Sequence, residues 1–456
     1  MLADLYTPVG IYLRIRDRFP GSVLLESAET NNVATSFSYI AIKPIAGMEI
    51  NHSTLEYKYP GGRVTQEALT QTEPVADRLM AFIRSFKAEG DSPIDISKNF
   101  FGYTSYEAVG FFETLELDDK KTELPEIPLL RYRLYQYVIA IDHFKDELYL
   151  CENQIEGLES ELEEVETLIR IKDCPAYAFK KAGPASSNMT DDDYRAMVQK
   201  GIDHCHRGDV FQIVLSRSFA QQFSGDEFNV YRALRSINPS PYLFYFDYGD
   251  YRLMGSSPES QLIVKKNKAV IHPIAGTVKR TGDPAKDDAA TQRLLEDPKE
   301  NAEHVMLVDL ARNDMSRFAK NVHVSEYRKV HAFSHVIHLV SEVTGTLPAG
   351  TNPFALLAAS FPAGTLSGAP KFRAMELIDQ YEPTARGFYA GCIGSVSLEG
   401  NFNHAIMIRS FLSRQNSLRY QAGAGVVSRS VPESELQEVT NKLNALTQAL
   451  VLAESL

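Results

Sequence analysis

The apolar and polar positions in the C-terminal part of the chain alternate between patterns typical of strands and of helices. They predict strands at residues 242–247, 252–256, 260–265, 268–272, 334–344, 388–398, 404–413 and 417–423. They predict helices at residues 284–295, 299–312, 352–359, 370–380 and 433–454. Strands outnumber helices and often follow one another as hairpins. We therefore expect an α/β (α+β) fold with large antiparallel sheets, not a doubly wound parallel sheet.

The N-terminal part reads mainly as strands and loops, and a linker is expected at its end. Apolar runs on both sides of "DHFKD" predict a hairpin, and residues 156–172 have helical spacing. The segment 180–190 is rich in Gly, Pro and Ser and is the best candidate boundary. It would separate an N-terminal domain, residues 1–180, from a second domain, residues 190–456. Thr190 is expected to cap the first helix of the second domain.

Composition and charge narrow the classes of function. The chain has 456 residues and a formal net charge of −12. This charge argues against nucleic acid as the main partner, because such binding needs clustered cations. The N-terminus carries charges throughout and no apolar run reaches membrane-spanning length, so we expect neither a signal peptide nor a transmembrane helix. Four scattered cysteines fit a reducing compartment, and a cytoplasmic location is expected.

Carboxylates recur at helical spacing in two of the predicted helices. Glu300 and Glu303 are three residues apart in "KENAEHVMLVDLARND", and Glu435 and Glu438 share a helix face with Lys442 near the C-terminus. Two such pairs could meet around a hard divalent cation, and oxygen ligands alone suit Mg²⁺ better than Zn²⁺. The alternative is that these glutamates are solvated surface residues, which is the commoner situation for this spacing.

Other polar residues and glycines lie in apolar surroundings. Arg409 lies in "AIMIRSF", which is expected to be a strand, and its planar guanidinium suits a carboxylate; an edge-strand arginine that reaches solvent is the alternative. His338 lies in a predicted strand, either packed, exposed or acting as an acid/base group. Gly423 and Gly425 indicate either a ligand close to the backbone or a bulge.

Residues 361–378, "FPAGTLSGAPKFRAMELI", place a glycine-rich turn before a predicted helix. A turn of this kind can bind an anion at the helix N-terminus. The phosphate-binding pattern GxxxxGK[ST] is not met by "GTLSGAPK", which argues against a phosphate-ester enzyme. Lys371 and Arg373 open the helix and receive no assigned role.

The motifs in combination are far more specific than any one of them. "PIAGT", "ENAEHVMLVDLARND", "FPAGTLSGAPKFRAMELI", "RGFYAGCIGSVSLEG", "AIMIRSF" and "YQAGAGVVSRSVPESE" occur in this order. Together they resemble the chorismate-utilising enzymes, and among these the large subunits of anthranilate synthases. The resemblance is dense over residues 190–450 and thinner before them. It implies two packed antiparallel sheets with helices outside, and Mg²⁺-dependent conversion of chorismate and ammonia to anthranilate and pyruvate.

The resemblance also implies roles for particular residues. Glu303 and Glu438 would be direct Mg²⁺ ligands, supported by Glu300 and Glu435. His338 would act as acid/base during pyruvate elimination. The residues implied to contact the substrate are Gly276, Thr277, Thr365, Tyr389, Arg409, Gly423, Gly425 and Lys442.

Three positions favour anthranilate as the product over those of related enzymes. Gln212 stands where family members that add water carry a lysine base, and a neutral Gln cannot deprotonate water. Ala275 stands where aminodeoxychorismate synthases carry a lysine nucleophile. Thr365 matches the anthranilate synthases. The alternatives are an aminodeoxychorismate synthase component I and a non-catalytic tryptophan-sensing subunit.

The resemblance further implies a partner and an inhibitor. No glutaminase is fused to the chain, so a separate glutamine amidotransferase subunit is expected to supply ammonia. Feedback inhibition by L-tryptophan is expected from two segments that match the family. The residues of these segments are Leu25, Glu26, Ser27, Pro241, Tyr242 and Leu243.

Overall fold

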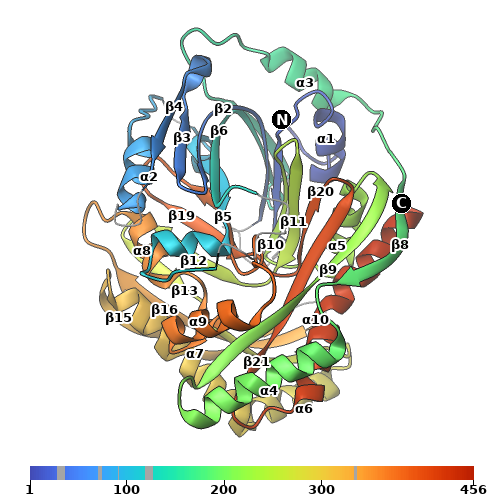
Figure 1. Cartoon of the computed structure of the whole chain (residues 1–456). Helices are drawn as coiled ribbons and strands as arrows, with labels where there is room; N and C mark the ends of the chain where they lie inside the picture. The colour runs from blue at the N-terminus through green and yellow to red at the C-terminus, as the bar shows by residue number, and fades with distance from the viewer. Residues whose placement is uncertain (28–35, 70–73, 91, 119–126, 333–335) are drawn as a thin grey trace.

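The computed structural model of the chain describes all residues except 28–35, 70–73, 91, 119–126 and 333–335 (Figure 1). The strands are β1 (Val23–Glu26), β2 (Phe37–Asn51), β3 (Thr54–Lys58), β4 (Val64–Ala68), β5 (Phe100–Thr104), β6 (Leu130–Asp142), β7 (Glu147–Glu152), β8 (Phe179–Ser187), β9 (Gln212–Gly225), β10 (Tyr242–Asp247), β11 (Tyr251–Ser257), β12 (Ser260–Lys265), β13 (Lys268–Ile271), β14 (Ile274–Lys279), β15 (Lys320–Ala332), β16 (Val336–Thr346), β17 (Gly368–Ala369), β18 (Cys392–Val396), β19 (Phe402–Ile406), β20 (Ser410–Arg414) and β21 (Ser417–Val426). The α-helices are α1 (Pro8–Ile15), α2 (Val75–Arg84), α3 (Leu162–Arg170), α4 (Asp191–Arg207), α5 (Phe228–Ile237), α6 (Pro284–Glu296), α7 (Pro298–Ser316), α8 (Pro353–Ser360), α9 (Lys371–Tyr381) and α10 (Pro432–Leu452).

Antiparallel pairing joins strands from both ends of the chain. β1 pairs with β2 and with β10, and β5 pairs with β6 and with β18. The long strands β9 and β21 pair along their length and lie diagonally across the lower half of Figure 1. The expected mixed α/β fold with large antiparallel sheets is confirmed.

The apolar core is packed from sheet faces and amphipathic helices. One buried cluster joins α4, α5 and α10 to β9 and β21. A second joins α2, α7 and α8 to β3 and β12. A third, rich in aromatic rings, contains Tyr103, Tyr135, Phe244 and Tyr251 from four different strands. The strands that carry the candidate site residues are packed into these clusters.

Local signals in the sequence locate several helices well. Thr190 caps α4 and accepts from the backbone N–H of Asp193, whose side chain returns to Thr190, and Gly208 ends the helix at φ 82°. The helices predicted at 284–295, 299–312 and 433–454 correspond to α6, α7 and α10 within a few residues.

Two expectations about local structure are wrong. The segment 180–190, expected to be a linker, instead forms most of β8, which pairs with β9. The strand predicted at 404–413 is two strands, β19 and β20, with Arg409 between them at φ 50°. The polar and small residues of 180–190 are tolerated because β8 is mostly exposed. The division into two domains at residue 190 stays a prediction.

Candidate active site

Gln212 connects the start of β9 to a glutamate on α7. Its Nε2 donates a hydrogen bond of 3.4 Å to Oε1 of Glu303. A Cβ atom at Gly425 of β21 would lie only 2.5 Å from the same Nε2, so glycine is required for Gln212 to take this position. At Gly423 the Cβ would lie 2.8 Å from the backbone oxygen of Leu215. Both glycines therefore allow close approach by β9, which is a packing reason for them.

His338 and Gly276 face each other across the pair β14–β16. Nδ1 of His338 lies 3.4 Å from the backbone oxygen of Gly276, and a carbonyl oxygen can only accept, so Nδ1 carries the proton. Burial, with a smaller contribution from the positive charge of Arg409, lowers the pKa of His338 to about 4. The imidazole is therefore neutral at physiological pH, with its lone pair on Nε2.

Position 276 requires glycine for two reasons: its backbone conformation and the lack of space for a side chain. Its φ is 78°, and a Cβ atom there would lie 2.8 Å from Cδ1 of Leu294 and 3.2 Å from Oε2 of Glu300. The carboxylate of Glu300 thus reaches the backbone of β14. The side chain of Thr277 lies outside the described residues, although its backbone pairs with His338.

Glu259 is a site residue that the sequence patterns do not reveal. It lies between β11 and β12, and its Oε1 accepts a hydrogen bond of 3.1 Å from Oγ1 of Thr365. Burial raises the pKa of Glu259 to about 7, against smaller opposing effects of Thr365, Lys442 and Arg409. No periodicity or motif distinguishes Glu259; its "SPES" turn gains meaning only when Thr365 lies beside it.

Arg409 is a partly buried cation between β19 and β20. Its Nη1 donates a hydrogen bond of 3.2 Å to Oδ1 of Asn238. Burial lowers the pKa of its guanidinium, and Glu259 is the carboxylate that partly compensates. Its backbone is left-handed, at φ 50°, and lies between the two strands, which corrects the expectation of an in-strand arginine.

Lys442 and Tyr389 approach from α10 and from the loop before β18. Nζ of Lys442 lies 2.7 Å from Oε1 of Glu438 and donates to the backbone oxygen of Gly423 at 2.9 Å. Tyr389 is buried, and burial raises the pKa of its phenol, with Glu438 adding to the rise. Lys442, Glu438 and Tyr389 therefore belong to one neighbourhood.

The carboxylates do not by themselves form a metal site in the described part of the chain. No group of three or more His, Cys, Asp or Glu side chains comes within metal-binding reach of one another there. Glu303 bonds to Gln212, Glu438 is paired with Lys442, and Glu435 is buried on α10. Their chemistry suits a hard cation such as Mg²⁺, but further oxygen ligands would have to come from a bound molecule.

The two segments implied in tryptophan binding lie side by side. β1 pairs with β10, with Leu25 opposite Phe244 and Glu26 opposite Leu243. Pro241 and Tyr242 stand at the start of β10, and Ser27 follows β1. Oε1 of Glu26 accepts from the hydroxyl of Tyr231 at 2.7 Å and from Nε of Arg235 at 2.9 Å, both on α5.

Lys371 and Arg373 serve the structure of α9. Nζ of Lys371 is buried and lies 2.7 Å from Oδ2 of Asp314 and 2.8 Å from the backbone oxygen of Ser360. Arg373 pairs with Glu376 one turn along the helix at 2.8 Å. With both cations engaged by carboxylates, the turn before α9 is not a phosphate cradle.

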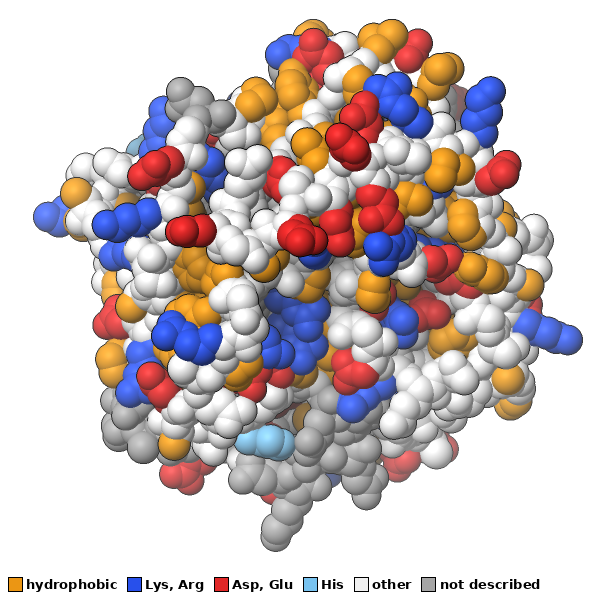
Figure 2. Space-filling model, turned by 90° about the horizontal axis from the view of Figure 1, so that it is seen from above, with side chains coloured by type: hydrophobic (Ala, Val, Ile, Leu, Met, Phe, Trp, Pro, Cys, Tyr) orange, Lys and Arg blue, Asp and Glu red, His pale blue; other side chains and the backbone are white. Residues whose placement is uncertain are grey.

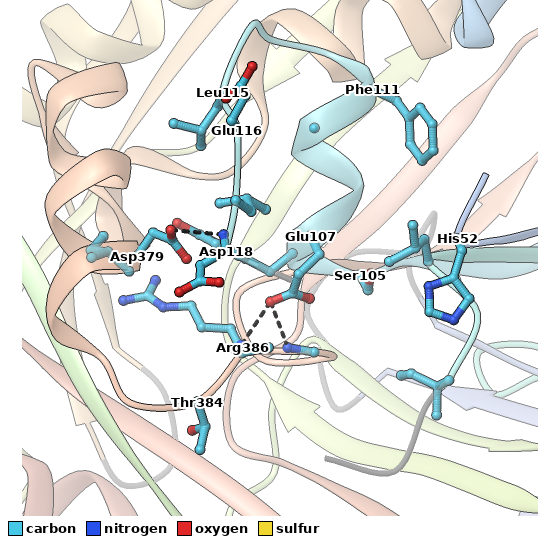
Figure 3. A pocket seen from close by; sticks show the side chains of 18 of the residues that line it. His52, Ser105, Glu107, Phe111, Leu115, Glu116, Asp118, Asp379, Thr384 and Arg386 are labelled. Carbon is cyan, nitrogen blue, oxygen red and sulfur yellow. Dashed lines mark hydrogen bonds between the residues drawn. The ribbon is translucent and has the colours of Figure 1, made fainter. Parts of the chain in front are cut away.

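A large cavity lies apart from the predicted site residues. It has a volume of about 780 Å³, and none of the predicted site residues lines it. Figure 3 shows Glu107 among its lining residues, where Oε1 accepts from the backbone N–H groups of Arg386 and Gly387 at 2.8 and 3.1 Å. Burial raises the pKa of Glu107 to about 7.

Charged side chains of both signs are spread over the surface that Figure 2 shows. Figure 2 shows acidic and basic side chains interspersed with uncharged and apolar ones over one face. Among the described helices, none is long and apolar enough to cross a membrane.

Comparison with known proteins identifies the family. A family model described as chorismate binding enzyme matches residues 24–448. Anthranilate synthase component 1 of Aquifex aeolicus is 35% identical over 480 residues, covering 100% of this chain and 94% of the relative. Anthranilate synthase component 1 of Neisseria meningitidis serogroup B is 37% identical over 469 residues, with the same coverage.

The fold agrees with solved structures. The crystal structure of anthranilate synthase component I from Streptococcus pneumoniae has a TM-score of 0.80 and 30% identity, and the match covers 98% of this chain and 99% of that one. The family match spans most of the chain, and the two relatives match over its full length. The chain therefore belongs to the chorismate binding enzymes and is an enzyme of the anthranilate synthase component 1 type.

Proposed function

We propose that this chain is the large subunit of an anthranilate synthase that converts chorismate and ammonia to anthranilate and pyruvate. The observation that carries the proposal is the contact between Gln212 and Glu303. A neutral amide at this position cannot deprotonate water, whereas ammonia is nucleophilic without a base. The similarity to chains named anthranilate synthase component 1 supports the same reaction.

Arg409 and Lys442 supply the positive charge that a dianionic substrate requires. Chorismate carries two carboxylates, and burying them demands compensating cations and hydrogen bonds. Arg409 is partly buried and has N–H donors beyond the one that bonds to Asn238, so it suits the enolpyruvyl carboxylate. Tyr389 would add a hydroxyl from the same neighbourhood.

Glu259 and His338 have complementary protonation states. With a pKa near 7, Glu259 holds a proton in much of the population at neutral pH and can donate it to the departing ring hydroxyl. His338 is neutral and has its lone pair on Nε2, so it can accept the ring proton that is lost during pyruvate elimination. Two groups whose pKa values are shifted in opposite directions thus take the acid and the base roles.

Glu303 and Glu438 would hold Mg²⁺, with Glu300 and Glu435 in support. Oxygen donors on two helices fit this cation, and the ring carboxylate would supply further ligands. When bound, Mg²⁺ would neutralise the ring carboxylate and orient the ring. Glu303→Gln should abolish Mg²⁺-dependent activity, whereas Asp309→Asn, an exposed change on the same helix, should not.

A glutamine amidotransferase subunit would deliver the ammonia, and L-tryptophan would bind where β1 and β10 meet. The number in the name component 1 supports a second component for the relatives. The adjacency of Glu26 and Leu243 supports one regulatory site built from both segments. We infer a cytoplasmic enzyme from the composition.

The deciding experiment is a product assay of the purified chain with chorismate and Mg²⁺. With ammonium, anthranilate should accumulate and be detected by its fluorescence. With glutamine alone, no product should form until the partner subunit is added. Accumulation of aminodeoxychorismate, isochorismate or salicylate would contradict the proposal.

A further inference from the structure

Asn238 holds the guanidinium of Arg409 from outside the set of predicted site residues. Asn238 ends α5, and its Oδ1 accepts the hydrogen bond of 3.2 Å from Nη1 of Arg409. We propose that Asn238 is a positioning residue, which fixes the guanidinium so that its remaining donors face the substrate carboxylate. The inference rests on the proposed function, in which Arg409 binds that carboxylate.

The orientation of the Asn238 amide is set by its other partners. Nδ2 donates to Oγ of Ser240 at 3.2 Å, and to the backbone oxygen and Oγ of Ser256 at 3.3 and 3.2 Å. A backbone oxygen cannot donate, so the nitrogen of the amide must face Ser256. The oxygen then necessarily faces Arg409. Ser240 and Ser256 are both buried, so water does not compete for these bonds.

The contacts close into a ring that includes the backbone of Arg409. The N–H of Ser256 donates to the backbone oxygen of Arg409 at 3.1 Å, while the Arg409 side chain bonds to Asn238 and Asn238 bonds to Ser256. Both ends of the arginine are thereby tied to one strand, β11. A non-glycine residue at φ 50° is uncommon and persists where its surroundings fix it, as this ring does.

The neutrality of Asn238 matters as much as its shape. A carboxylate at this position would form an ion pair with Arg409 and would compete with the substrate for its charge. An amide oxygen holds the guanidinium and leaves that charge for the ligand. Because Arg409 is partly buried, the competing charge would be less screened than at the open surface.

Three variants test the proposal by steady-state kinetics with chorismate and ammonium. Asn238→Ala should raise KM for chorismate about 10-fold with kcat nearly unchanged. The reason is that the contact between Arg409 and the carboxylate, which is made equally in the ground state and the transition state, is weakened. Asn238→Asp, which keeps the shape, should raise KM further, to about 100-fold. Asn229→Asp, the matched change at a buried asparagine of α5 that does not contact Arg409, should leave KM unchanged.

The order of the effects separates positioning from a merely structural role. If Asn238 were merely structural, Asn238→Ala would raise KM at least as much as Asn238→Asp. Both variants would then also lower kcat and the stability of the fold. In an Arg409→Ala background, changes at Asn238 should have no further effect on KM. The inference would be overturned if both variants folded and kept the KM of the wild type. It would also be overturned if Asn238→Ala raised KM more than Asn238→Asp.

Failure of the proposed reaction can be distinguished from failure of the positioning role of Asn238. If the wild-type chain made no anthranilate, the proposed reaction would be wrong, and the positioning role would be tested by crystal structures of the wild type and Asn238→Ala. Displacement of the Arg409 guanidinium in the variant would support the role. A guanidinium that keeps its place without Asn238 would overturn it.

Discussion

Thr365 donates a hydrogen bond of 3.1 Å from its Oγ1 to Oε1 of Glu259, and this bond places a carboxyl group of raised pKa in the wall of the candidate site. The two residues are 106 positions apart in the chain. Thr365 lies in the glycine-rich turn before α9, and Glu259 follows β11. The turn thus contributes to the site through a hydroxyl, not through an anion-binding helix end.

Glu259→Gln should remove the proton donor while keeping the shape of the neutral side chain. We expect kcat to fall by about 10²- to 10⁴-fold with little change in KM, because general acid catalysis is lost. Steady-state assays with saturating ammonium check this. Glu399→Gln, a change at an exposed glutamate, is the control. A kcat within a few-fold of wild type would rule out Glu259 as the acid.

The raised pKa of Glu259 also predicts a pH-dependent difference in stability. Its folded-state pKa of about 7 exceeds its ordinary value of 4.5, so the folded state binds the proton more tightly than the unfolded state. The wild type should therefore lose stability, relative to Glu259→Gln, as the pH rises from about 4.5 through about 7. Urea unfolding at pH 5 and pH 8 measures this difference. An equal difference at both values would contradict it.

His338→Ala should separate the two halves of the proposed reaction. We expect amination to continue while pyruvate release falls by about 10²- to 10⁴-fold, because the base for the ring proton is missing. The pKa of about 4 predicts that His338 stays neutral as the pH falls from 8 to 5, which NMR titration of the ring can follow. His323→Ala, at an exposed histidine, is the control. Pyruvate release at the normal rate would assign His338 another role.

The sequence predicts features that depend on neighbouring residues better than features that depend on distant ones. The capping of α4 by Thr190 rests on contacts within three residues, and it was predicted correctly. β14 was missed, because its partner β16 lies far from it along the chain. β15 was missed as well, although its partner β16 is the next strand along the chain.

The candidate site shows the same difference between residues recognised from local motifs and residues that depend on distant partners. Motif resemblance placed Arg409 and Gln212 in the site, and the structure brings them to Glu259 and Glu303. Glu259 and Asn238 were missed, since each becomes functional only through a partner more than 100 residues away. The conformation of Arg409 was also mistaken, because the left-handed turn that divides β19 from β20 leaves no mark in an apolar run.

Gln212→Lys should weaken Mg²⁺ binding by placing an ammonium beside Glu303. Nε2 of Gln212 lies 3.4 Å from Oε1 of Glu303, so a lysine there would pair with this carboxylate and compete with the cation. We expect the Mg²⁺ concentration for half-maximal activity to rise at least about 10-fold. Gln222→Lys, at an exposed position of β9, should leave it unchanged. An unchanged Mg²⁺ requirement in Gln212→Lys would remove Glu303 from the ligand set.

Arg386→Met should destabilise the fold and loosen the loop that carries Thr365. The side chains of Arg386 and Glu382 are 1% and 4% exposed and lie 2.6 Å apart, and Arg386 also donates to the backbone oxygens of Leu366 and Val214. Removing the cation leaves a buried carboxylate unpaired, which costs about 3–5 kcal/mol of unfolding free energy.

The matched control for Arg386→Met is the exposed pair on α9. Arg373 and Glu376 lie 2.8 Å apart with side chains 42% and 40% exposed, so Arg373→Met should cost less than about 1 kcal/mol. Urea unfolding of both variants measures the contrast. Because Leu366 follows Thr365 directly, Arg386→Met should also raise KM for chorismate in the fraction that stays folded. Equal stability of the two variants would show that the buried pair is dispensable, and an unchanged KM would show that Thr365 is held by other contacts.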